Sequence, residues 1–156
     1  MPKSPAEVVQ AILSEPTNRE RVRGLVHPDA TYVSLNYENP DLHKIMPWAG
    51  TQTGADAIVD TYSEVGRRWS NEGFDIEELF ESGENVAVFG RFAYRAHTTD
   101  KLVTSPFSIL AKVTDGKVSY MQFMEDTFAS ASSFRTGGTW RFRSDPDGGE
   151  VSVGDA

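Results

Sequence analysis

The chain has 156 residues, 38% of them hydrophobic, and a formal net charge of −8. This length suits one domain with a real hydrophobic core, and the acidic balance argues against a dedicated nucleic-acid or anionic-membrane surface. The lack of cysteine excludes disulfides, thiolate catalysis and cysteine-ligated metals. No segment has the length and hydropathy of a signal peptide or a membrane span, so we expect a cytoplasmic protein.

The first part of the chain has helical patterns. Ser4 and Glu7 have the spacing of a capping box, and the apolar stripe that follows ends at Pro16, which predicts a first helix. Thr17 and Glu20 repeat the box and predict a second short helix.

A β-strand and a third helix are predicted next. Residues 29–37 are rich in β-branched and aromatic side chains, which favours a strand, and residues 38–54 have the composition of a loop. The third helix is predicted to start at Thr53 as its N-cap. Its apolar stripe repeats at helical spacing and consists of Ile58, Tyr62, Val65 and Trp69.

From Phe74 onward the apolar period changes to two, which is typical of strands. Four strands joined by short turns are predicted over residues 74–81, 86–97, 102–113 and 118–128. Helices followed by a run of antiparallel strands indicate an α+β fold. The residues after 134 are rich in Ser, Gly and Asp but contain aromatic side chains, so we expect a partly ordered tail over residues 135–156.

The turn at Asp115-Gly116 sets the predicted register of the last two strands. A two-residue turn there places Phe107 opposite Met124 and Ser105 opposite Asp126. A symmetric turn over residues 98–101 adds Tyr94 beside Ser105. Directly opposed residues share one face of a sheet, so this register puts Asp126 on the apolar face, whereas one bulge would invert the assignment. The face so predicted carries Phe92, Tyr94, Ser105, Phe107, Ile109, Gln122, Met124, Asp126 and Phe128.

The chain resembles the nuclear transport factor 2-like superfamily, closest to its SnoaL-like and ketosteroid-isomerase-like branch. The resemblance covers roughly residues 5–134 and lies in "PWAGTQTGADAIVDTY", "GENVAVFGRF" and "QFMEDTF". It implies one domain over residues 1–134, a cone in which a curved, mostly antiparallel sheet wraps around N-terminal helices and encloses an apolar pocket. It also implies a homodimer formed through the outer face of the sheet.

The candidate site follows from the predicted register and from this resemblance. A carboxylate among aromatic and methionine side chains has a raised pKa, which suits acid/base work near neutral pH. SnoaL-like cyclases use an aspartate on the last strand as acid/base, and Asp126 matches that position. Tyr94 is the nearest hydroxyl donor. His43 is within reach of the pocket mouth, and a plain surface position is the alternative for it. The remaining predicted pocket residues are Tyr32, Trp48, Phe92, Ser105, Phe107, Gln122 and Met124.

Two alternatives stay open for these residues. Asp126 also suits a strand end or a helix cap, and Tyr94 also suits a core tyrosine with a satisfied hydroxyl. The steroid-isomerase pattern asks for a second pocket acid, and the matching strands offer Ser105, Phe92 and Phe107 instead.

The expected function is binding of a small hydrophobic molecule, with cofactor-free isomerase, cyclase or dehydratase chemistry if the protein is an enzyme. The alternative is a non-catalytic ligand-binding or protein-interaction module of the same fold. No metal-ligand spacing is present, so we expect neither a metal nor another cofactor. We expect no nucleic-acid or membrane partner, and the sequence does not name the ligand.

Overall fold

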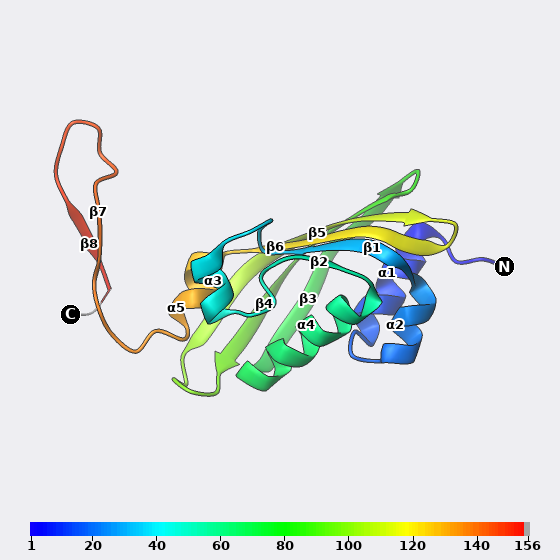
Figure 1. The fold of residues 1–156 in the computed structure, drawn as a ribbon, viewed down its shortest axis with the longest axis horizontal. Coiled ribbons are helices and arrows are strands. Elements are labelled where there is room, and N and C mark those ends of the chain that lie inside the picture. The colour runs from blue at the N-terminus through cyan, green and yellow to red at the C-terminus, as the bar shows by residue number, and fades with distance from the viewer. Residues whose placement is uncertain (155–156) are drawn as a thin grey trace.

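A curved six-stranded sheet forms the body, and helices α1 (Pro5–Ser14), α2 (Arg19–Leu25) and α4 (Ala55–Arg68) cover one of its faces (Figure 1). The structure is a computed structural model that describes residues 1–154. The helices and the mostly antiparallel sheet confirm the predicted α+β cone. In chain order the strands of the sheet are β1 (Val26–Ser34), β2 (Gly50–Thr53), β3 (Trp69–Ser82), β4 (Asn85–Ala96), β5 (Leu102–Thr114) and β6 (Lys117–Glu125).

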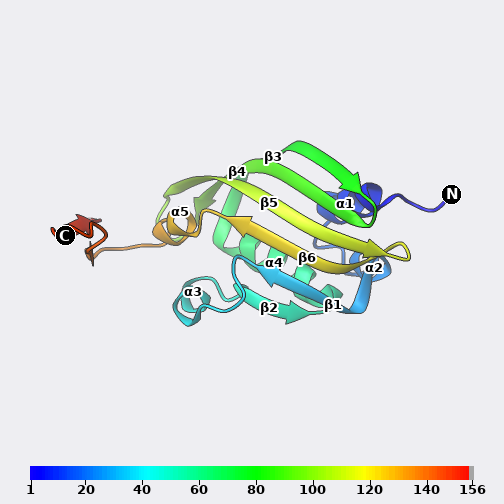
Figure 2. The ribbon, with the colours of Figure 1, turned by 90° about the horizontal axis from the view of Figure 1, so that it is seen from above.

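The strand order is β2-β1-β6-β5-β4-β3, so the first strand lies beside the last one (Figure 2). Strands β3 to β6 form the predicted antiparallel meander, whereas β1 runs parallel to β6. The parallel pair is long range in sequence and joins β1 and β2 to the meander.

The helix starts agree with the sequence in one case and differ in two. Ser4 caps α1 in a complete capping box with Glu7, as predicted. The cap of α2 is Asn18 rather than Thr17, because the Asn18 side chain accepts from the Arg21 amide. Helix α4 starts after Gly54 rather than Thr53, at a φ of 94° that suits glycine.

The predicted loop over residues 38–54 contains two elements. Asn39 caps the short helix α3 (Pro40–Ile45), with proline in its first turn. Strand β2 then pairs with β1 at the sheet edge. Both are too short to give a periodic signal, which is why the sequence pattern did not reveal them.

The core lies between the helices and the concave face of the sheet. Side chains from α1, α4 and alternate positions of β4 and β5 are almost fully buried there. This alternation is what a sheet with one covered face requires. The members with the least exposed surface include Val9, Ile12, Ile58, Val86, Val88 and Met121.

The last described residues form a separate hairpin that stands away from the body (Figure 1). Its strands β7 (Trp140–Phe142) and β8 (Val151–Val153) pair antiparallel with each other. The short helix α5 (Thr127–Ser132) joins it to the body, and the sequence pattern did not predict this helix. The predicted order of the tail over residues 135–156 stays a prediction, and residues 155–156 lie outside the part described.

Candidate functional site

The pairing of β5 with β6 decides which acidic side chain faces the helices. Thr114 pairs with Lys117 as predicted, but the register shifts by one residue after Val113. Ser119 is the extra residue, because Val118 pairs with Val113 while Tyr120 pairs with Lys112. Phe107 therefore lies opposite Glu125. The prediction that Phe107 faces Met124 was wrong, since a single bulge inverts a face.

Asp126 lies outside the cavity and caps helix α5. Its side chain accepts from the Ala129 amide at 3.1 Å and is exposed to solvent. The Asp126 amide donates to Ser105 Oγ at 2.9 Å, which holds the end of β6 against β5. The expected place of Asp126 on the apolar face was wrong, and the capping role left open above is the one the structure contains.

A small cavity lies between α4 and the concave face of the sheet, and Glu125 is its acidic side chain. Its free volume is about 20 Å³, enough for about one water molecule. Its walls come from β1, the segment before β2, α4, the start of β3, β4 and β6. The lining residues are Tyr32, Ser34, Trp48, Thr61, Tyr62, Val65, Trp69, Tyr94, Phe123 and Glu125.

The environment of Glu125 favours its neutral form. Burial of the carboxyl raises its pKa to about 7, because desolvation penalises the charged form. The side chain of Ser130 on α5 hydrogen-bonds to the carboxyl and lowers its pKa, and the negative charge of Asp126 raises it. A carboxyl group with such a pKa is able to accept and to return a proton near neutral pH.

Three tyrosine side chains surround this carboxyl in the cavity. Burial raises the pKa of Tyr32, Tyr62 and Tyr94, and the charge of Glu125 raises each of them further. All three phenols therefore stay protonated and serve as hydrogen-bond donors. Tyr32 and Tyr94 were predicted to line a pocket, whereas Tyr62 was predicted only as part of the apolar stripe of α4.

Two tryptophans form another part of the wall. The rings of Trp48 and Trp69 meet edge to face with centroids 5.5 Å apart, and Arg68 lies over Trp48 at 5.4 Å. Trp69 Nε1 donates to Ser133 Oγ at 3.0 Å, and its ring packs on Phe134 at 4.5 Å. The segment after α5 therefore covers Trp69 from outside. Trp48 was predicted to line the pocket, whereas Trp69 was predicted as the last member of the helical stripe and instead is the first residue of β3.

The other predicted pocket residues lie elsewhere. Phe107 is buried in an aromatic layer between Phe74 and Phe123, and Phe92 stacks on Tyr94 at 4.2 Å. Phe92 and Phe107 lie behind the cavity and do not line it. Gln122 and Met124 lie on the opposite face of β6 from Glu125, because the bulge inverts their predicted orientation.

His43 is exposed on α3, where its Nδ1 lies 3.0 Å from the Ala49 carbonyl oxygen. It lines a separate surface hollow together with Tyr37 and Thr51. His43 therefore does not lie at the mouth of the inner cavity, and the surface position given above as the alternative is the one that the structure contains.

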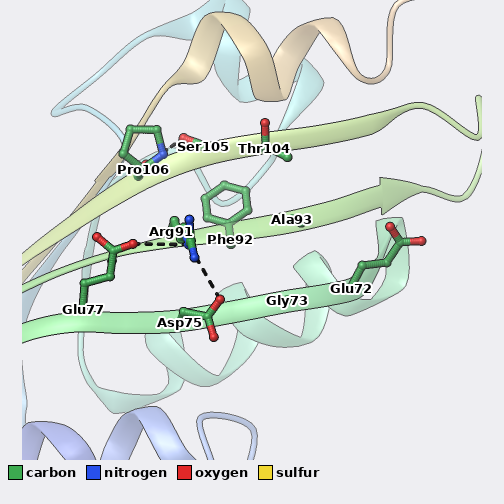
Figure 3. A pocket seen from close by; sticks show the side chains of 11 residues that line it. Glu72, Gly73, Asp75, Glu77, Arg91, Phe92, Ala93, Thr104, Ser105 and Pro106 are labelled. Carbon is green, nitrogen blue, oxygen red and sulfur yellow. Dashed lines mark hydrogen bonds and ion pairs between the residues drawn. The ribbon is translucent and has the colours of Figure 1, made fainter.

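A wide hollow lies on the outer face of the sheet (Figure 3). It measures about 620 Å³, and Arg91 lies there between Asp75 and Glu77, with its Nε 3.2 Å from the Glu77 carboxylate. These charges are solvated and paired within the chain, so the ion pairs contribute little to the free energy of folding. We place the candidate site in the smaller inner cavity, because burial in this cavity raises the pKa of the Glu125 carboxyl toward neutral pH.

Within residues 1–154, no group of three or more His, Asp or Glu side chains has the arrangement of a metal site. In the same range, no helix is both long and apolar enough to span a bilayer.

Comparison with known sequences points to one family. The family model described as "SnoaL-like domain" matches residues 12–121. Patulin synthesis protein F of Aspergillus clavatus is 43% identical over 132 residues, which are 82% of this chain and 67% of that protein. The match thus spans about two thirds of the length of this curated relative.

Solved structures share the fold at low sequence identity. An NTF2-like protein from Burkholderia thailandensis has a TM-score of 0.70 at 20% identity, covering 85% of this chain and 98% of that one. TerC, co-crystallised with polyporic acid, has a TM-score of 0.66 at 24% identity, covering 83% and 97% of the two chains.

Proposed function

Because this chain belongs to the SnoaL-like domain family, we propose that it performs acid/base chemistry on a small, largely apolar molecule. The observation that carries the proposal is the carboxyl of Glu125, which lies in a cavity walled by aromatic side chains. The reaction types that fit are isomerisation, cyclisation and dehydration, since each moves a proton to or from carbon or oxygen. Side chains of the chain itself supply the acid and the base.

In this proposal Glu125 is the acid/base group and Tyr94 is a donor near it. The carboxylate takes a proton from a carbon next to a carbonyl group and later returns it at another atom. Tyr94 stays protonated throughout, because burial and the charge of Glu125 raise its pKa. Aromatic walls keep water away from the reacting atoms, which strengthens every polar interaction inside.

The relatives support a biosynthetic role for such chemistry. The curated relative is named for patulin synthesis, and TerC was co-crystallised with polyporic acid. We therefore expect the ligand to be a small oxygen-bearing intermediate of natural-product synthesis. A cavity of about 20 Å³ admits it only after a wall moves, and the cover over Trp69 formed by Ser133 and Phe134 is the part we expect to move.

The test uses the two neighbouring acids as a matched pair. Deuterium exchange at the α-carbon of 2-cyclohexen-1-one, followed by NMR in D₂O, measures proton abstraction without knowledge of the true substrate. We expect wild type to accelerate the exchange, Glu125→Gln to lose about 100-fold or more, and Asp126→Asn to keep nearly all of it. Full exchange in Glu125→Gln would refute the role of Glu125.

A protein-interaction module is the second candidate, and the C-terminal hairpin favours it. Trp140 and Phe142 share one face of the hairpin with Val151 and Val153, and three of these four side chains are exposed.

An outer-face homodimer is also proposed, because Phe80, Phe89 and Leu110 form an exposed apolar patch there. Wild type that accelerates no exchange but self-associates through this patch would favour the second candidate.

A further inference from the structure

Ser130 has a fully buried hydroxyl group in the short helix α5. This hydroxyl donates to the Asp126 carbonyl oxygen at 3.2 Å, which is long for a hydrogen bond from a hydroxyl. The same oxygen already accepts from the Ser130 backbone amide at 3.0 Å, so the helix does not need the hydroxyl. Alanine, the residue on each side of Ser130, favours a helix more than serine does. The hydroxyl therefore serves something other than the helix.

The second acceptor of this hydroxyl is the Glu125 carboxyl. The Ser130 side chain hydrogen-bonds to the carboxyl and lowers its pKa, against the larger effect of burial. Glu125 lines the inner cavity, whereas Ser130 belongs to α5 and lies outside the lining. A hydroxyl has one proton to donate, so Ser130 bonds at any moment either to the carbonyl oxygen or to the carboxylate. The charged carboxylate is the stronger acceptor of the two.

Hydrogen bonds to the cavity wall fix the position of Ser130. Its carbonyl oxygen accepts from Ser133 Oγ at 2.7 Å, and Ser133 Oγ accepts from Trp69 Nε1 at 3.0 Å. Both serines are almost fully buried. A group that orients a charged side chain has itself to be held in one place. This chain of hydrogen bonds holds Ser130 beside the carboxyl.

We propose that Ser130 is the positioning residue of the Glu125 carboxylate, because its hydroxyl donates to one carboxylate oxygen from α5 and leaves the other oxygen to the cavity. This rests on the function proposed above, in which Glu125 takes a proton from the substrate. The last torsion of a glutamate side chain has a broad energy profile, so a carboxylate without a partner rotates. Ser130 restricts this rotation, and the free oxygen then meets the C–H bond of the substrate in one orientation.

The Ser130 hydroxyl changes its partner during the reaction. While Glu125 is charged, the hydroxyl donates to the carboxylate and stabilises the form that accepts a proton. Once the carboxyl is neutral, it is a weaker acceptor, and the hydroxyl returns to the Asp126 carbonyl oxygen. Ser130 keeps its own proton throughout and touches no reacting atom.

Other titratable groups also surround this carboxyl. Among residues 1–154, those that act on it or line its cavity are Asp126, Tyr32, Tyr62 and Tyr94. The three phenols stay protonated near neutral pH, because burial raises the pKa of each. All four groups are kept in the variants below, so a change in the titration of Glu125 reports on Ser130.

The test is a carbon-13 NMR titration of protein whose glutamates are labelled at the side-chain carboxyl carbon. The signal that Glu125→Gln lacks belongs to Glu125, and no substrate is needed. Ser130→Ala removes the hydroxyl, and Ser130→Cys keeps the shape of the side chain but donates only weakly. Ser63→Ala is the matched control, because Ser63 Oγ donates to the Val59 carbonyl oxygen at 2.9 Å, also four residues earlier on its helix.

We expect Glu125 of wild type to titrate near pH 7 and both Ser130 variants to titrate about one pH unit higher or more, because the charged form loses a donor. Ser63→Ala should titrate as wild type does. In the exchange assay with 2-cyclohexen-1-one, the Ser130 variants should be about fivefold or more slower at pH 7. They should stay slower at about pH 9.5, where the carboxyl is ionised in every variant, because its orientation is lost.

Several results would overturn the inference. An unchanged titration in both Ser130 variants is one, and exchange as fast as in wild type at about pH 9.5 is another. A shift that Ser63→Ala shares would show that any lost helix hydroxyl has this effect. Titration of wild type near the ordinary value of 4.5 would overturn both this inference and the proposed function. A shifted titration without exchange in wild type would refute only the proposed function and would leave the Ser130 hydrogen bond in place.

Discussion

Glu125 and Asp126 are neighbours in the chain, but their side chains lie in different environments at the junction of β6 and α5. Glu125 is the last residue of β6 and faces the cavity, whereas Asp126 is exposed and caps α5. The α5 cap fixes the direction in which the chain leaves the strand, and Ser105 holds the Asp126 amide. One acid therefore stabilises the local structure that holds the other in a desolvated place.

The stability of the fold should depend on pH through Glu125. Its pKa is raised from the ordinary value of 4.5 to about 7 in the folded chain. Between these values the unfolded chain has lost this proton while the folded chain keeps it, so the free energy of unfolding falls as the pH rises. From pH 4 to pH 8, the free energy of unfolding of Glu125→Gln should rise by about 1–3 kcal/mol relative to that of wild type. Urea unfolding at a series of pH values measures this difference.

Asp126→Asn is the control for that experiment, because asparagine also caps helices. This variant keeps the Glu125 carboxyl, so its free energy of unfolding should still fall as the pH rises, by less than in wild type because the Asp126 charge no longer raises the Glu125 pKa. A flat difference between Glu125→Gln and wild type would mean that the Glu125 carboxyl is solvated in the folded chain.

Gly90 allows the aromatic layer behind the cavity to pack. A Cβ at this position would lie 2.1 Å from the Asp75 carbonyl oxygen and 2.6 Å from Cε1 of Phe107. Neither the strand backbone nor the ring, which stacks on Phe74 and Phe123, has room to yield. We expect Gly90→Ala to lose about 2 kcal/mol or more of stability in urea unfolding.

Gly24 provides the matched control on helix α2. A Cβ there meets nothing within 4 Å, and alanine favours the helix over glycine. Gly24→Ala should therefore leave stability unchanged or raise it by about 0.5–1 kcal/mol. Equal free energies of unfolding for Gly90→Ala and Gly24→Ala would mean that Phe107 does not pack closely against the backbone at position 90.

Ser133 connects the segment after α5, which covers the cavity, to Trp69 in the cavity wall. The Ser133 hydroxyl accepts from Trp69 Nε1 and donates to the Ser130 carbonyl oxygen at 2.7 Å, and the side chain is buried. Ser133→Ala leaves the indole N–H without a partner, which should cost about 1–3 kcal/mol in urea unfolding. Ser132→Ala, one residue earlier and partly exposed, should change stability by less than about 0.5 kcal/mol. Equal effects of the two changes would contradict this anchoring role.

The sequence predicted those parts of the fold that long periodic patterns describe. The stripe of α4, the capping box at Ser4 and the four-strand meander are local signals, and the structure contains all of them. The family and the α+β cone were also predicted correctly. The parallel pairing of β1 with β6 has no local signal, because it joins segments far apart in the chain.

The candidate site was predicted less well, and one residue explains most of the difference. Ser119 forms a β-bulge that its residue type does not predict. The bulge inverts the face of every later residue of β6. The predicted positions of Tyr32, Trp48 and Tyr94 do not depend on the register of β6, and all three line the cavity. Tyr94 lies opposite Val103 rather than Ser105 as predicted, and this shift of two residues keeps its face. The same inversion places Glu125 instead of Asp126 in the cavity. It also turns Gln122 and Met124 to the outer face of the sheet.

The C-terminal hairpin should be dispensable for the fold of the body. Its strands pair only with each other in the described chain, and its ring contact with the body is that of Trp140 with Phe128 at 5.7 Å. A chain that ends at Thr136 keeps Phe134 on Trp69 and keeps the Arg135 carbonyl oxygen, which accepts from Lys101 Nζ at 2.7 Å. We expect this truncated chain to melt within about 3 °C of the full chain, since the lost contact lies near the surface.

Light scattering on the two chains then tests what the hairpin does. An isolated two-stranded hairpin is marginally stable in water, so its apolar face needs another surface to stay ordered. If a second copy supplies that surface, the full chain should be dimeric and the truncated chain monomeric at the same concentration. If both chains are dimeric, the patch of Phe80, Phe89 and Leu110 holds the copies together. A melting temperature that falls by about 10 °C on truncation would instead show that the hairpin packs on its own body.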